Sequence, residues 1–237
     1  MVKPIELKSV CGCCTIRERC LPAGLSDEEV LVIDQYMEHR LPVKKGELLY
    51  SQGDPLEALF AISTGSFKTL ILHEDGRSQI TGFQLSGEIM GLDAISNERH
   101  TCDAIALEDS TVCKIPFDSF EELESEMSRL QHNFNKTLSS EIVKDHNLML
   151  LLGSMRAEEK MAAFLINLSQ RFHARQQSAS ELVLRMTRED MGNYLGLKLE
   201  TVSRILSRFA EEGLITVQGR HITLIDEKKL HSVTISA

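Results

Sequence analysis

Four cysteines lie within ten positions near the start of this 237-residue chain, in the stretch CGCCTIRERC at residues 11–20. Thiols at this density can form disulfides, bind a metal or take part in redox chemistry. The opening residues, MVKPIELKSV, contain no apolar run of the secretory type, so we expect a cytoplasmic protein. Reducing conditions there favour metal binding or redox sensing over structural disulfides. Four thiolates suit either Zn²⁺ or an iron–sulfur cluster.

A second set of side chains is suited to reading DNA. Glu200, Ser203 and Arg204 are spaced i, i+3 and i+4, which places them on one face of a helix. Arg204 can bond to O6 and N7 of a guanine, Glu200 can accept from N4 of a cytosine, and Ser203 can reach a base edge or a phosphate. The alternative is an ordinary Glu200–Arg204 ion pair on a solvent-exposed helix. The surrounding pattern favours base reading.

That surrounding pattern is typical of a winged helix-turn-helix. Thr187 suits the N-cap of a short helix that ends at Leu195, and Gly196 supplies the turn. A second helix is predicted from 199 to 212, and it stops at Gly213. The runs LITV and HITLI, joined by QGR, predict a hairpin that forms the wing.

The net charge of −9 is unevenly distributed along the chain. Residues 1–154 carry 14 Lys and Arg against 25 Asp and Glu, whereas residues 155–237 carry 12 against 10. An acidic body with a mildly basic C-terminal part permits DNA binding by that part. No run of about 18 apolar residues occurs, so we expect no association with a membrane.

Between residues 41 and 117, short apolar runs alternate with glycine-containing turns, which predicts a β-sandwich or jelly roll. A metal oxygenase built on such a roll is disfavoured, because the roll holds only His73 and His100 and no H-x-H pair. Before it, LSDEEVLVIDQYM predicts a short helix with Ser26 as N-cap and Glu29 completing a capping box.

Residues 118–153 lack proline and interior glycine, which predicts a helix about 50 Å long if it is continuous. Its apolar residues recur at steps of three, four or seven: Met127, Leu130, Phe134, Leu138, Ile142, Met149 and Leu152. We expect this stripe to form the interface of a homodimer, and the alternative is packing against the chain's own β-domain. Asp145 lies on the stripe and weakens or tunes association, because burying like charges is costly.

The chain resembles the cyclic-AMP receptor family of bacterial transcription regulators, in its fumarate-and-nitrate-reduction (FNR) oxygen-sensing branch. The resemblance rests on QITGF at 79–83, VCKIPF at 112–117, LLLGS at 150–154, GNYLGL at 192–197 and ETVSR at 200–204. It implies an α+β fold with four parts in order. These are a cysteine-rich iron–sulfur segment (1–25), a β-roll (jelly-roll) sensor domain (26–117), a long dimerisation helix (118–153) and a C-terminal winged helix-turn-helix that binds DNA (154–237).

The resemblance further implies a transcription activator and not an enzyme. A homodimer binds an inverted repeat in double-stranded DNA that is similar to TTGAT–N4–ATCAA, and Glu200, Ser203 and Arg204 match the residues that read each half-site. Family members also contact RNA polymerase, for which the turn HEDGRSQ, with Asp75 and Gly76, is the matching segment. Its alternative interpretation is an ordinary exposed turn.

The cofactor implied by the resemblance is a [4Fe–4S] cluster that supports dimerisation without oxygen. Family members hold it by three cysteines spaced C-x2-C-x5-C and one distant cysteine. Cys11, Cys14, Cys20 and Cys113 match these ligands, and Cys13 and Cys102 have no counterpart in the ligand set. Two alternatives remain. One is a regulator of the same fold that senses nitric oxide, a nucleotide or thiol oxidation, although His100 is a poor substitute for the arginine of nucleotide-binding members. The other is a zinc-stabilised DNA-binding protein.

Overall fold

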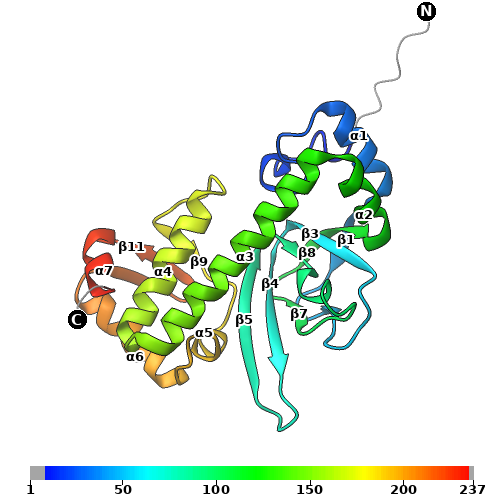
Figure 1. Cartoon of the computed structure of the whole chain (residues 1–237). Helices are drawn as coiled ribbons and strands as arrows, with labels where there is room; N and C mark the ends of the chain where they lie inside the picture. The colour runs from blue at the N-terminus through cyan, green and yellow to red at the C-terminus, as the bar shows by residue number, and fades with distance from the viewer. Residues whose placement is uncertain (1–8, 235–237) are drawn as a thin grey trace, which may run out of the picture. The chain divides into compact units, whose positions relative to one another are not determined.

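The structure, a computed structural model, describes residues 9–234 and forms two compact units (Figure 1). Of the described residues, the first unit comprises 9–77 and 81–141. The second begins at residue 142 and includes residues 78–80. Within residues 9–234, no helix is both long enough and apolar enough to cross a membrane.

Two four-stranded sheets form the β-roll of the first unit, with strand orders β1-β8-β3-β6 and β2-β7-β4-β5. A buried core that includes Ile62, Phe67 and Val112 draws its members from strands of both sheets. The strands are β1 (Glu38–Val43), β2 (Leu48–Tyr50), β3 (Ala58–Thr64), β4 (Ser66–Leu72), β5 (Ser78–Leu85), β6 (Ile89–Met90), β7 (Asp103–Ala106) and β8 (Ser110–Pro116). The predicted roll is therefore confirmed.

A second core of the first unit lies on the other face of strands β3 and β8. Side chains alternate along a strand, so Leu59 and Ala61 of β3 belong to this second core while Ile62 belongs to the first. Cys113 of β8 pairs with Ala61 and shares the second face with Ile115. The second core is covered by the N-terminal cysteine segment and by three helices. These are α1 (Asp27–Tyr36), α2 (Phe117–Glu126) and the start of α3 (Ser128–Ser154).

The prediction of a single helix over 118–153 is wrong, because the helix is interrupted at Met127, which separates α2 from α3. Met127 adopts an extended backbone with φ −114° and ψ 92°. The 27 residues of α3 span about 40 Å rather than about 50 Å. The break changes the chain direction, which lets Phe120 of α2 and Phe134 of α3 bury in the same core, where their rings meet edge to face at 4.6 Å. Tertiary packing thus overrides an unbroken helical pattern.

The second unit has the predicted winged helix-turn-helix, extended by two elements that the sequence pattern did not reveal. Its helices are α4 (Ala157–His173), α5 (Arg188–Leu195), α6 (Leu199–Glu211) and α7 (Glu227–Val233). Its strands are β9 (Glu181–Val183), β10 (Ile215–Gln218) and β11 (His221–Leu224), in the order β10-β11-β9. The wing hairpin therefore gains a third strand, β9, and helix α7 packs against α4.

Candidate functional site: thiol cluster and helix-turn-helix

The structure gathers four of the six cysteines on one side of the roll. We call Cys11, Cys14, Cys20 and Cys113 the thiol cluster. Cys11 is buried, and Cys20 and Cys113 pack against the same core. Burial raises the pKa of the Cys20 thiol to about 12, opposed by the Leu21 backbone, and negative charge on Cys113 and Cys14 adds to the increase.

The pKa values of Cys11 and Cys113 are raised in the same way. Burial raises the pKa of the Cys11 thiol, and the neighbouring Asp34, Cys20 and Cys113 raise it further. The pKa of Cys113 is raised chiefly by burial, with Cys14 among the further causes. A cation among thiols that oppose one another's ionisation stabilises all of them as thiolates. The donor set therefore fits a metal ion or an iron–sulfur cluster.

The remaining cysteines lie elsewhere. Cys13 is exposed, and Cys102 is buried in the core between the two sheets. There the Cys102 thiol donates to Asp93 over 3.5 Å, next to His100, whose ring stacks on Tyr50 at 3.7 Å. His100 is buried, and its Nδ1 lies 3.4 Å from the Asp93 carboxylate. The imidazole is thus engaged with neighbours inside the roll.

The cysteine segment is tied to the body by specific hydrogen bonds. The Asp34 carboxylate of α1 accepts from the backbone N–H groups of Val10 and Cys11, both at 2.9 Å. Arg17, which lies among the cysteines, donates to Asp27 and to the Leu25 carbonyl at 2.9 and 2.7 Å. Its guanidinium therefore has a structural role in holding the segment.

Helix α3 holds the segment that follows Cys20. The side-chain amide of Asn133 donates to the carbonyls of Leu21 and Ala23 at 3.2 and 2.8 Å. Arg129, one turn earlier, donates to the carbonyl of Gly24. We call these three hydrogen bonds the loop clasp. They join the segment that carries three members of the thiol cluster directly to α3, and no sequence motif marks them.

The predicted dimer stripe divides into two parts along α3. Met127, Leu130 and Phe134 are buried in the core of their own chain, and Leu138 packs against that core. Ile142 and Met149 are exposed by 56 % and 62 %, Asp145 is exposed, and Leu152 is half-buried. Val143 and Leu150 add further exposed apolar surface. Only the second part of the stripe is open to a partner.

The helix-turn-helix is built by local features that the sequence shows. Thr187 caps α5 in a reciprocal capping box with Asp190. Gly196 ends α5 in the left-handed conformation, at φ 65°, which glycine adopts without strain. At Gly192 a side chain has no room, since a Cβ atom there would lie 2.6 Å from the Leu197 carbonyl oxygen. Both glycines are thus required by the turn between α5 and α6.

Helix α6 buries one face and exposes the predicted reading residues on another. Val202, Ile205, Leu206 and Phe209 are buried. Glu200 and Arg204 are exposed, and Ser203 is half-buried. Along α6, Arg208 pairs with Glu212 and with Glu158 of α4. Glu200 and Arg204 stand at the N-terminal part of α6, where a recognition helix meets the major groove.

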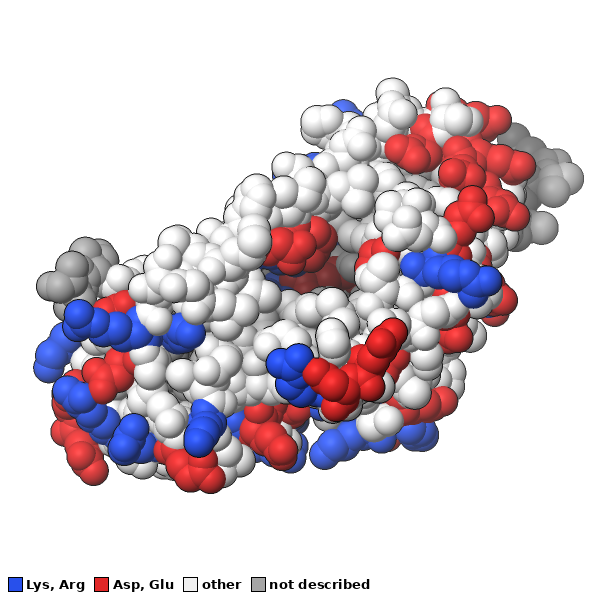
Figure 2. All heavy atoms as spheres, turned by 60° about the horizontal axis from the view of Figure 1, so that its bottom comes forward, with Lys and Arg blue, Asp and Glu red and all other residues white. Residues whose placement is uncertain are grey.

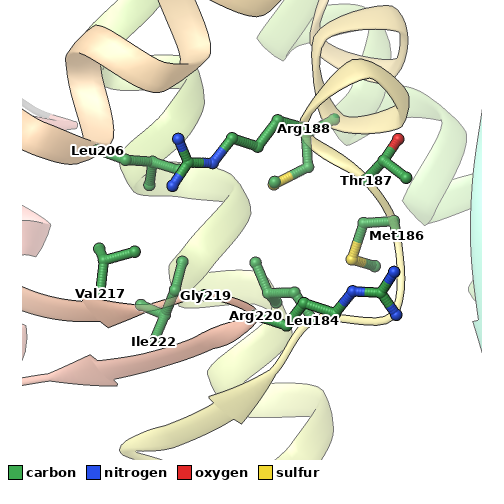
Figure 3. Close-up of a pocket in the computed structure, with 10 residues that line it drawn as sticks. Leu184, Met186, Thr187, Arg188, Leu206, Val217, Gly219, Arg220 and Ile222 are labelled. Carbon is green, nitrogen blue, oxygen red and sulfur yellow. The ribbon is translucent and has the colours of Figure 1, made fainter.

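Two arginines that the sequence reasoning missed flank a pocket of about 220 Å³ between α5, α6 and the wing. In Figure 3 the Arg188 side chain crosses the pocket towards Leu206, and that of Arg220 extends towards Met186. Arg188 donates to the Ser203 hydroxyl at 3.3 Å. Arg188 is the first residue of α5, directly after the N-cap Thr187, and Arg220 follows Gly219 in the wing turn. These two positions are the signal by which the sequence could have identified both arginines.

Acidic side chains are unevenly distributed over the surface (Figure 2), and the turn predicted to contact RNA polymerase is exposed. Figure 2 shows acidic side chains gathered in the upper right of the view, and both signs mixed in its left part. Asp75 and Gly76 form the turn between β4 and β5. Both are exposed, and Asp75 pairs with Arg77 at 2.6 Å. The Asp75–Arg77 ion pair thus stabilises a turn that is exposed to solvent.

Comparisons with known proteins agree with this architecture. The Crp-like helix-turn-helix domain family matches residues 159–233, and the cyclic nucleotide-binding domain family matches residues 40–126. Regulatory protein HlyX of Actinobacillus pleuropneumoniae is 46 % identical, with 90 % of this chain and 89 % of that protein covered. The fumarate and nitrate reduction regulatory protein of Yersinia pestis is 43 % identical, with 93 % and 88 % covered. The solved structure of FixK2 from Bradyrhizobium japonicum has a TM-score of 0.78 at 32 % identity, covering 85 % of this chain and 98 % of FixK2.

Proposed function

Because the chain belongs to the CRP/FNR family of transcription regulators, in its FNR branch, we propose that it is an oxygen-responsive regulator whose thiol cluster holds a [4Fe–4S] cluster. The observation that supports the proposal is that Cys11, Cys14 and Cys20 lie near enough to one another or to the distant Cys113 for their charges to raise one another's pKa. A bound [4Fe–4S] cluster supplies an oxygen-sensitive centre whose positive iron keeps the four thiols ionised.

The chain's own residues connect this centre to α3. When Cys11, Cys14 and Cys20 hold one bound group together with Cys113, the N-terminal segment is fixed to the body of the roll. The ordering of the segment extends through Leu21 to Gly24. The loop clasp then fixes α3 through Asn133 and Arg129. A state that orders the segment therefore also favours one position of α3, by the difference in free energy between the two states.

We propose that the exposed part of α3 forms the homodimer contact. Ile142, Met149 and Leu152 supply the apolar surface, and Asp145 opposes association because two carboxylates meet near the twofold axis. The dimer then places two copies of α6 on an inverted repeat similar to TTGAT–N4–ATCAA.

In each half-site, Glu200, Ser203 and Arg204 read base edges. Arg188 and Arg220, which line the same pocket beside α6, contact phosphates next to the reading helix and fix its register on the duplex. The turn at Asp75 and Gly76 is the proposed contact with RNA polymerase, because it is exposed and braced by Arg77.

The proposal is tested by DNA binding before and after exposure to air. The chain is purified without oxygen, and its affinity for a duplex with the inverted repeat is compared with that for a duplex with one scrambled half-site. We expect tight, half-site-dependent binding that falls when air is admitted. A colourless, zinc-containing protein whose DNA binding is stable in air contradicts the proposal.

A further inference from the structure

We propose that Cys11, Asp34 and His39 form a mononuclear site for a divalent metal of the Zn²⁺ type, which shares the Cys11 thiolate with the thiol cluster. One ligand atom of each of the three residues lies within 4.8 Å of the other two. Thiolate sulfur, carboxylate oxygen and imidazole nitrogen are the donor types that Zn²⁺ accepts. The oxygen-sensing function uses neither Asp34 nor His39 as a ligand.

The histidine and the carboxylate are already at ligand spacing. His39 Nε2 lies 3.1 Å from Asp34 Oδ1. Two nitrogen or oxygen ligands of one tetrahedral zinc ion lie about 3.3 Å apart, given bonds of roughly 2.0–2.1 Å. The other ring nitrogen, Nδ1, is buried and has no hydrogen-bond partner within the described residues. Nε2 also lies 3.4 Å from the Asp34 backbone carbonyl oxygen, so a bound metal would replace this long hydrogen bond.

Backbone groups orient the carboxylate and leave it free to ligate. Asp34 Oδ1 accepts from the N–H of Cys11, and Oδ2 accepts from the N–H of Val10. A carboxylate offers about four lone-pair positions, so the two that the backbone does not use, which face the Cys11 thiol and His39 Nε2, are open to a metal that replaces the protons there. The same hydrogen bonds hold Cys11 beside the carboxylate, just as hydrogen bonds to ligating side chains fix metal ligands in other proteins.

A β-bulge directs His39 into this site. Glu38 pairs with Lys114 and Leu41 pairs with Val112, so His39 and Arg40 together stand opposite the single residue Cys113. Arg40 has φ 55°, which is uncommon for a residue other than glycine. Its backbone N–H bonds to the Cys113 thiol, while the His39 side chain lies against Asp34. Bulges commonly re-aim a side chain beside a functional site.

Sharing Cys11 has a regulatory consequence, which rests on the proposed function. A thiolate that ligates zinc is withdrawn from the thiol cluster, so zinc and iron–sulfur assembly compete for Cys11. The site is enclosed yet reachable, with Cys11 7 % exposed and the side chains of Asp34 and His39 15 % and 16 % exposed. Zinc therefore holds the cluster-free chain in a state that resists reassembly.

The test is a Co²⁺ titration of the reduced, cluster-free full chain, with Co²⁺ as the coloured substitute for Zn²⁺. The Cys113→Ser background removes the distant member of the thiol cluster, and the number of thiolates in the charge-transfer band distinguishes the proposed site from binding by several of the thiols at 11–20. In that background we expect one Co²⁺ per chain, with a charge-transfer band of one thiolate and visible bands of a tetrahedral ion that Zn²⁺ abolishes. Adding His39→Gln lowers the Co²⁺ affinity at least about tenfold. Adding the matched control His73→Gln, at an exposed position, leaves it unchanged.

Asp34→Asn is the second test variant, because its amide oxygen still accepts a backbone hydrogen bond, and we expect the same loss as in His39→Gln. Absence of Co²⁺ binding in Cys113→Ser, or binding that neither His39→Gln nor Asp34→Asn weakens, overturns the site. Iron–sulfur reconstitution of the unmodified chain separates the two proposals. A chain that assembles no cluster but binds Co²⁺ through His39 refutes the oxygen-sensing function and keeps the zinc site, and the converse result refutes the zinc site alone.

Discussion

Replacing Asn133 with alanine removes two of the three hydrogen bonds of the loop clasp. The carbonyls of Leu21 and Ala23 lose a donor at 3.2 and 2.8 Å. Each such bond contributes about 0.5–1.5 kcal/mol net, and water replaces part of it because Asn133 is half-buried. We therefore expect the segment after Cys20 to open with a free energy lower by about 1–2 kcal/mol, which is a five- to thirtyfold larger open population.

Hydrogen exchange at the amides of Ala23 and Leu25 measures this opening, because both donate only within the segment, to the carbonyls of Cys20 and Pro22. Exchange at both amides should accelerate five- to thirtyfold in Asn133→Ala, while amides of the roll keep their rates. Asn135→Ala, at an exposed position of the same helix, is the matched control and should change neither. Equal rates in Asn133→Ala and the control refute the idea that the loop clasp restrains the segment.

Three further substitutions test other parts of the account. Gly192→Ala places a Cβ atom 2.6 Å from the Leu197 carbonyl oxygen, so it should lower the free energy of unfolding by about 1–3 kcal/mol in urea unfolding and weaken DNA binding in gel-shift assays. Gly153→Ala, which has open space around its Cβ atom, is the control and should do neither. Arg204→Ala should cost about 1–3 kcal/mol at one base position per half-site, and an equal loss on every sequence would assign Arg204 to phosphate instead. Asp145→Ala should tighten self-association of the cluster-free chain about fivefold in analytical ultracentrifugation, from about 1 kcal/mol of relieved repulsion, and an unchanged constant would remove the carboxylate from the dimer contact.

Elements set by local chemistry could be predicted from the sequence. Ser26 and Thr187 cap their helices through reciprocal capping boxes, and Gly196 ends α5 as a left-handed residue. These features depend on residues three or four positions apart, which a sequence displays directly. The alternation that puts Cys113 on the face of Ile115 is equally local.

Features set by tertiary contacts could not be predicted. Met127 has no helix-breaking side chain, and the break there follows from where two helices must bury their phenylalanines. The loop clasp depends on Asn133 meeting carbonyls more than a hundred positions earlier in the chain. Nothing in the sequence marks His39 as a metal ligand, because its proposed role follows from a shift of the strand register opposite Cys113.

The central claim is that Cys11, Cys14, Cys20 and Cys113 together hold one cluster, and iron and sulfide analysis tests it most directly. The chain is reconstituted without oxygen and compared with Cys13→Ser and Cys113→Ser. The account predicts iron and sulfide matching one [4Fe–4S] cluster per chain in the unmodified protein and in Cys13→Ser, and loss of that cluster in Cys113→Ser. A full complement of iron and sulfide in Cys113→Ser, or none in the unmodified chain, would contradict it.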